Sequence, residues 1–164
     1  MHFAIEQRIE GLPGAVASVF VDEGFYVSLD ALPKLGRPEV LSREVHDTIV
    51  HMRVRYRFTG ELSSAVRAVV DPHKLTWVEE TDHDLAARNV SFRMIADHYA
   101  DRFRADGHYR FEPSGATATI RRCEGDLEVR MRLVGHRVEQ AIVSGLREHL
   151  NTEVDFVEAW LGAR

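Results

Sequence analysis

Cysteine is almost absent from this chain of 164 residues, which contains only Cys123. A single cysteine excludes an internal disulfide and a cysteine-rich zinc site, and it fits a reducing compartment. Long apolar runs are also missing, since none approaches the roughly 20 residues that a membrane-spanning helix needs. The N-terminus becomes charged at Glu6 and lacks the apolar stretch of a signal segment. We therefore expect a cytoplasmic protein without stable membrane insertion.

The motifs of several enzyme and metal-site classes are lacking as well. The chain has no Gly-x-Ser-x-Gly elbow, no His-Glu-x-x-His pair and no Gly-rich phosphate loop. Two short segments, 82–84 and 97–101, do contain Asp and His. We interpret both as turns, where Asp is favoured by local hydrogen bonds. We expect no metal and no cofactor.

The charge pattern argues against a nucleic-acid partner. The formal net charge is −5, whereas dedicated nucleic-acid-binding domains are typically basic. One cationic stripe, formed by His51, Arg53, Arg55 and Arg57, could in principle bind phosphate. We interpret it instead as the solvent face of a sheet, because neighbouring predicted strands offer charged cross-strand companions.

The clearest pattern in the chain lies between residues 47 and 59. Basic and apolar side chains alternate there with a period of two, which predicts a long β-strand with one apolar face. Such a strand belongs to an antiparallel sheet that is covered on one side only. The apolar members are Val50, Met52, Val54, Tyr56 and Phe58.

Similar patterns and turn signals divide the rest of the chain. Two short helices are predicted after the first strand, one beginning at Pro13 and one over 25–32. Residues 62–70 are consistent with a short helix or an irregular loop. We assign turns to 82–84, 106–107 and 113–115, and a bulge or turn to 124–126. The predicted strands are 2–10, 40–46, 48–59, 74–81, 89–97, 103–112 and 116–133.

After Gly135 the period becomes helical up to about Leu161, which predicts a helix of about 26 residues and about 39 Å. Two polar residues, His149 and Glu153, lie one turn apart inside its apolar arc. A charged group there is costly unless it is paired. The two residues are either a polar anchor for a ligand or an ion pair at the rim of a cavity. The arc itself consists of Val138, Ile142, Leu146, Leu150, Phe156, Val157, Trp160 and Leu161.

This order of elements, with Val-Gly-His-Arg-Val-Glu at 134–139 and Phe-Val-Glu-Ala-Trp-Leu at 156–161, resembles a bacterial branch of the START-like superfamily. That superfamily includes lipid-transfer domains, polyketide cyclase-like proteins and pollen-allergen-like binders. The resemblance implies one α+β domain over residues 1–164 with the helix-grip fold. In this fold a curved antiparallel sheet of about seven strands wraps around the long C-terminal helix. It also implies a cavity between the sheet and that helix, but no shared catalytic motif.

The side chains on the apolar faces are candidates for the lining of that cavity. Among them, Glu79 is either an inward carboxylate or an exposed group at a strand end. We expect a small, largely apolar partner, such as a lipid-, polyketide- or isoprenoid-like molecule, bound without chemistry. One alternative is a cyclase- or hydratase-like enzyme that uses an inward carboxylate and His149. Another is a protein-interaction module with a filled core. The lining candidates are Val54, Tyr56, Phe58, Trp77, Glu79, Phe92, Met94, Tyr109, Phe111, Met131, Leu146, His149 and Glu153.

Overall fold

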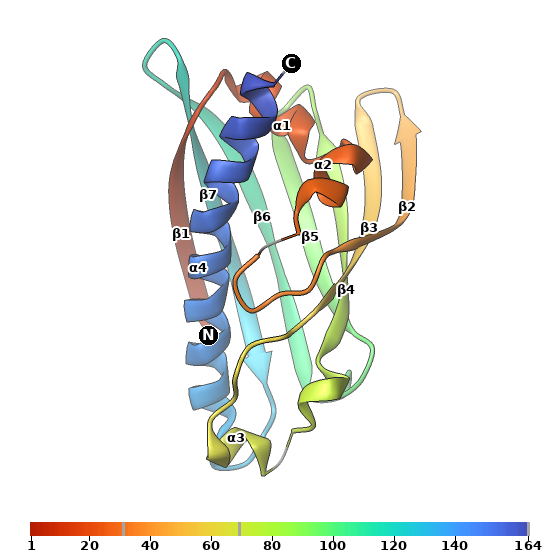
Figure 1. Cartoon of the computed structure of the whole chain (residues 1–164), viewed down its shortest axis with the longest axis vertical. Coiled ribbons are helices and arrows are strands. Elements are labelled where there is room, and N and C mark those ends of the chain that lie inside the picture. Colours follow the sequence, from red (N-terminus) through yellow and green to blue (C-terminus); the bar gives the residue numbers. More distant parts are fainter. Residues whose placement is uncertain (31, 69, 164) are drawn as a thin grey trace.

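The computed structural model describes residues 1–30, 32–68 and 70–163. Within these ranges one antiparallel sheet of seven strands has the order β1-β7-β6-β5-β4-β3-β2 and curves around helix α4, Gly135–Gly162 (Figure 1). Two short helices, α1 (Pro13–Val19) and α2 (Glu23–Ser28), follow the first strand. The predicted helix-grip fold is confirmed. The strands are β1 His2–Glu10, β2 Glu39–His46, β3 Ile49–Arg57, β4 Thr76–Asp84, β5 Asn89–Ala96, β6 Phe103–Ser114 and β7 Ala118–Val129.

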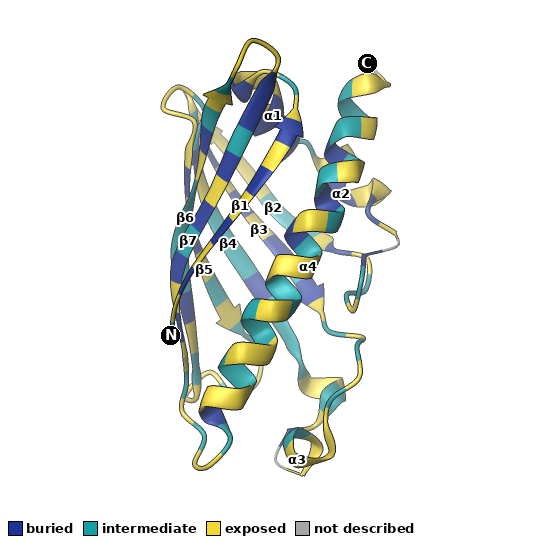
Figure 2. Ribbon diagram, turned by 90° about the vertical axis from the view of Figure 1, so that its left-hand side faces the viewer, coloured by how far each residue is buried: buried dark blue, intermediate teal, exposed yellow. Residues whose placement is uncertain are grey.

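Helix α4 lies over one side of the sheet rather than over its centre. Its contacts are mainly with β1, β7 and α1, and Figure 2 shows it crossing that side along its whole length. Leu150 and Val157 face the sheet and are 2% and 0% exposed. None of the described helices is both long and apolar enough to cross a membrane.

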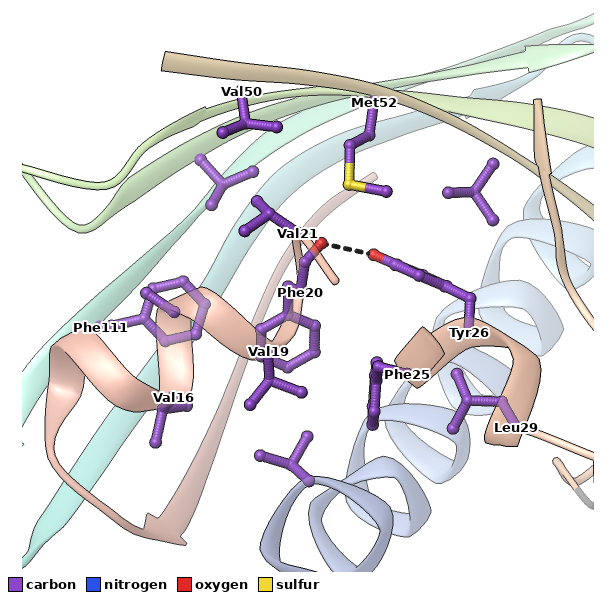
Figure 3. Packing of buried hydrophobic residues seen from close by; sticks show 14 of the residues in the cluster. Val16, Val19, Phe20, Val21, Phe25, Tyr26, Leu29, Val50, Met52 and Phe111 are labelled. Atoms are coloured by element: carbon purple, nitrogen blue, oxygen red, sulfur yellow. Dashed lines mark hydrogen bonds between the residues drawn. The ribbon is translucent and has the colours of Figure 1, made fainter. Parts of the chain in front are cut away.

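The other end of the inner face is filled by α1 and α2. Tyr26 of α2 points toward Met52 of β3, and Phe20, the residue after α1, stacks on Phe111 of β6, with Phe25 edge-on against Phe20 (Figure 3). The Tyr26 hydroxyl donates a hydrogen bond of 2.9 Å to the Phe20 carbonyl oxygen, which satisfies its polar end inside an apolar cluster.

The structure corrects the two predicted interruptions that involve glycine. Gly107 lies opposite Gly125 in two strands that continue on either side. A Cβ atom at Gly107 would lie 2.2 Å from the Glu124 carbonyl oxygen and 2.8 Å from the Phe92 ring. The glycines at 106–107 and 124–126 therefore allow strands and rings to approach closely, and they form no turns.

Other boundaries also differ from the prediction. Residues 82–84 belong to β4, and the turn follows them, with Arg88 at a φ of 55°. Strand β7 ends at Val129 rather than at 133, and Leu133 is fully exposed with a φ of 69°. Within 62–70 the structure has a short helix, α3, over Ser64–Arg67, and the second predicted helix begins earlier, at Glu23. Residue 31 of the second predicted helix, residue 69 of the segment 62–70 and residue 164 of the predicted domain lie outside the described residues.

Candidate functional site

Arg121 of β7 is the centre of a polar cluster on the inner face of the sheet, where it is 2% exposed. Its Nη1 donates to Glu153 Oε2 at 2.5 Å and its Nη2 donates to the Leu150 carbonyl oxygen at 2.9 Å. Its Nε donates to Oε1 of Gln7, its direct neighbour on β1, at 3.1 Å. The guanidinium also lies 5.1 Å from the centre of the Phe20 ring. The buried charge is thus paired with a carboxylate, and each of its three nitrogens donates a hydrogen bond, as its burial requires.

Neither Arg121 nor Gln7 was predicted as a site residue, although strand periodicity could have indicated both. Arg121 alternates in phase with Cys123 and Leu127, and Gln7 alternates in phase with Ile5 and Ile9. A polar residue on the apolar side of a strand must find a partner inside.

The predicted pair of His149 and Glu153 is present, and the structure gives it a different main partner. His149 Nε2 lies 3.8 Å from Glu153 Oε1, and the two side chains are 11% and 6% exposed. The pair is therefore buried rather than half solvated at a rim. Burial lowers the pKa of His149, Glu153 opposes this shift, and Arg121 adds to it. We conclude that His149 is a neutral imidazole, whose Nδ1 has no hydrogen-bond partner among the described residues.

Glu79 is the second carboxylate of the inner face. It lies opposite Val54 of β3 and Met94 of β5, and β4 continues beyond it to Asp84, so it is not an exposed strand end. The Tyr109 hydroxyl donates to Glu79 Oε1 at 3.5 Å. The pKa of Glu79 is raised to about 7, by burial most of all and then by the charge of Glu153, while the Tyr109 hydrogen bond and the charge of Arg121 act to lower it. Near neutral pH the protonated and ionised forms of this carboxyl group are therefore both populated.

Aromatic rings surround Glu79. Trp77 stacks on Tyr56 with 5.8 Å between ring centres, and Phe92 contacts Tyr109 with 5.0 Å between centres. The Tyr56 ring also meets the His149 ring edge-on at 6.3 Å. Tyr56 and Phe92 are buried, but three side chains of the same region remain partly exposed although they lie on the inner side: Trp77, Met94 and Tyr109.

Three predicted lining residues lie away from this region. Phe111 stacks on Phe20 at 5.6 Å and belongs to the cluster that α1 and α2 fill. Phe58 follows the end of β3 and pairs with Leu35. Met131 follows the end of β7 and is not a strand residue. The structure places the other candidates on the inner side: Val54, Tyr56, Trp77, Glu79, Phe92, Met94, Tyr109, Leu146, His149 and Glu153.

The outer face is organised by charge pairs. Glu80, one residue after Glu79, points the other way and binds Arg53 at 3.1 Å and Arg93 at 2.6 Å. His51 pairs with Asp82 in the same row. Two members of the cationic stripe of β3 are thus paired with acidic residues of β4, and a third, Arg55, lies near Glu39 of β2 and Asp97. A depression of about 610 Å³ on this face is lined by the Gly107–Gly125 crossing and by charged or polar groups that include His108, Arg110 and Glu124.

Solved structures with the same fold come from bacteria and a plant. One is TTHA0849 from Thermus thermophilus, with a TM-score of 0.71 and 18% identity over 99% of this chain and 98% of that one. Another is the Zhui aromatase/cyclase from Streptomyces sp. R1128, with a TM-score of 0.67 and 17% identity over 100% and 94%. Norcoclaurine synthase from Thalictrum flavum has a TM-score of 0.64 and 16% identity over 100% and 87%. Likeness at these identities concerns the fold, and it confirms the helix-grip fold that the START-like resemblance implied.

At the level of sequence, no curated protein matches the chain. The model of one family, described as "Protein of unknown function (DUF2505)", matches residues 5–161, which is nearly the whole chain. The chain belongs to this family.

Proposed function

We propose that the protein binds a small, largely apolar molecule between the inner face of the sheet and α4. The observation that carries this proposal is the partial exposure of Trp77, Met94 and Tyr109 on the inner side, beside a polar cluster that is itself buried. Leu146 of α4 is also partly exposed. Inward-facing apolar side chains of a filled core are normally buried. A mostly apolar wall with a few polar groups is the usual composition of a small-molecule site.

The neighbours in fold support this proposal in a general way. The names of two of them, an aromatase/cyclase and norcoclaurine synthase, describe proteins that act on small molecules. In this chain the wall would be formed by Tyr56, Trp77, Phe92 and Tyr109, and the polar contacts by Glu79 and His149.

A fluorescence titration with the neutral apolar probe N-phenyl-1-naphthylamine tests the proposal. The wild-type protein should bind the probe, and Leu146→Trp should weaken binding at least about tenfold, or about 1.4 kcal/mol, because the indole fills the space. Leu133→Trp is the matched control, because Leu133 is fully exposed and its substitution should leave affinity unchanged. A wild-type protein that binds no apolar probe would instead favour a filled interior and the interaction-module alternative.

One observation favours acid–base chemistry as a second candidate function. Glu79 has a pKa raised by burial to about 7, and His149 has a pKa lowered by burial. Tyr56 interacts with both groups, since its ring contacts the His149 ring and the charge of Glu79 helps to raise the pKa of its hydroxyl. A carboxyl group that can hold a proton near neutral pH and a neutral imidazole are an acid and a base of the kind that a cyclase- or hydratase-like step requires.

This second function can be tested with 1-phenyl-1,3-butanedione, whose acidic C–H group exchanges with deuterated water. NMR should show exchange accelerated by the wild-type protein, and Glu79→Gln and His149→Phe should each remove the acceleration. Binding of the diketone without faster exchange would leave binding alone as the function.

A further inference from the structure

The described charged groups of the inner face near α4 do not balance. Arg121 carries one positive charge. This charge is paired with the Glu153 carboxylate, whose Oε2 lies 2.5 Å from Arg121 Nη1. Its other partners, Gln7 and the Leu150 carbonyl, are neutral. Glu79 forms no ion pair with any described residue, and the hydrogen bond that it accepts comes from the neutral Tyr109 hydroxyl. An ionised Glu79 is therefore a negative charge that no cation in the described part of the chain pairs with.

The surroundings of Glu79 match an organic cation. Trp77 lies two residues earlier on the same face of β4, stacked on Tyr56, and Tyr109 contacts Phe92 on the other side. Faces of Trp and Tyr rings attract ammonium groups, and a carboxylate supplies the full counter-charge. Trp77 and Tyr109 are also among the partly exposed inner residues, so a ligand in the proposed site would touch them.

We propose that the apolar ligand carries a protonated amine and that Glu79 is its anionic partner. This inference rests on the proposed function and specifies its ligand class. The remaining groups around Glu79 do not supply a cation: His149 of α4 is neutral, and Arg121 of β7 is bound by Glu153. The other groups that sense the charge of Glu79 are neutral at physiological pH, since burial raises the pKa of each of them: Tyr26, Tyr56, Tyr109 and Cys123.

Proton release provides a direct signature. Below its pKa of about 7 the free Glu79 holds a proton, which the ammonium group must displace. Each amine bound at pH 6 should then release close to one proton, because linkage equates the change in bound protons with the change in pKa. A neutral ligand of the same shape should release none.

The test is competition against N-phenyl-1-naphthylamine by 2-(1-naphthyl)ethylamine, by 2-(1-naphthyl)ethanol and by 1-naphthylacetate. At pH 8 the amine should displace the reporter at least about tenfold better than the alcohol does, as expected for a close charge pair shielded from water. The acetate should bind worst. At pH 5.5 the advantage of the amine should shrink, because Glu79 is then protonated. Calorimetry of the amine at pH 6 in two buffers of different ionisation enthalpy measures the released proton.

Two neighbouring substitutions separate the site from general electrostatics. Glu79→Gln should abolish the preference for the amine and the proton release while the reporter still binds. Glu80→Gln, on the outer face and already paired with Arg53 and Arg93, should change neither. A reporter that binds while amine and alcohol compete equally, or a preference that survives Glu79→Gln, overturns this inference and leaves the proposed function intact. A wild-type protein that binds neither the reporter nor any competitor overturns both.

Discussion

The inner face of the sheet is built from aromatic residues in two regions that behave differently. At the end covered by α1 and α2, Phe20 and Phe25 meet edge-on at 5.8 Å and are 8% and 0% exposed, and the partly buried Trp160 of α4 packs edge-on against Phe25 at 6.0 Å. In the middle, Trp77 and Tyr109 stack against neighbours but remain partly exposed beside Glu79. The first region is a closed apolar core, and the second combines accessible rings with buried charge.

The difference follows from what covers each region. Two short helices place several large side chains against one end of the sheet (Figure 3). Helix α4 packs mainly on β1 and β7, so the middle strands receive fewer covering side chains. A close-packed region contributes stability, whereas an incompletely covered region with polar groups is suited to binding. Truncation and substitution should therefore affect the two regions differently.

The largest effect is expected from removing α4. A chain that ends at Gly135 loses the buried Leu150 and Val157, and each fully buried large side chain contributes on the order of 1.5–3 kcal/mol. Together with the rest of the apolar arc this approaches the whole stability of a domain. Circular dichroism during denaturant unfolding should show no cooperative transition. Removal of residues 162–164 alone should preserve it. A truncated chain that unfolds cooperatively would contradict the role given to α4.

The fold could be predicted because its determinants are local and periodic. Alternation over 49–57 defined β3, and the change to a helical period after Gly135 defined α4. The two wrongly predicted interruptions at 106–107 and 124–126 have one physical origin, because the sequence alone does not distinguish a glycine in a turn from a glycine at a close crossing of strands. Gly107 and Gly125 are needed because two strands and the Phe92 ring approach there, which is a contact between residues distant in sequence.

The site could be predicted only in part, for a related reason. His149 and Glu153 were recognised as a pair because both lie on one helix, one turn apart. The partner that dominates Glu153 is Arg121, 32 residues earlier and on a strand. Its pairing depends on how β7 faces α4, which no local pattern shows. Likewise, that Glu79 forms no ion pair with any described residue could not be predicted, because it depends on Arg121 being paired with Glu153.

The next largest effect is expected from Arg121→Met. The substitution leaves Glu153 buried without its counter-charge, and breaking a buried pair on one side costs about 3–5 kcal/mol of unfolding free energy. Arg122→Met is the control, since the adjacent side chain lies on the outer face with Glu6 and Glu112, and it should change stability little. The double variant Arg121→Met with Glu153→Met should recover most of the loss. Urea unfolding of the four proteins measures these changes.

A smaller effect, dependent on pH, is expected from Glu79→Gln. The folded pKa of about 7 lies above the ordinary value of 4.5 because of burial. Between these values the unfolded chain holds fewer protons than the folded one, so wild-type stability should fall as pH rises. The fall should level off above pH 7 and reach up to about 3 kcal/mol, at about 1.4 kcal/mol per pH unit. In Glu79→Gln the fall should be absent, whereas Glu80→Gln should retain it. A wild-type stability that is flat between pH 4.5 and 7 would contradict the raised pKa of Glu79.

The smallest effect in this series is expected from Glu153→Gln, which distinguishes a structural pair from a ligand anchor. The amide keeps the volume and an acceptor oxygen for Arg121, but it removes the charge, so stability should fall by roughly 1–3 kcal/mol. Glu148→Gln, one turn earlier on α4 and paired with Lys34 at the surface, should change stability little. Because Arg121 holds Glu153 at 2.5 Å, affinity for the neutral naphthylamine probe should be unaltered.

Glu153→Gln should also change the titration of Glu79. The ionised Glu153 is one cause of the raised pKa of Glu79, so its loss should lower that pKa and shift the pH-dependent fall in stability to lower pH. Melting curves across pH and one probe titration measure all three quantities. Weaker probe binding with unchanged stability would instead make Glu153 a ligand anchor, and Arg121 would then serve the ligand rather than hold α4 on the sheet.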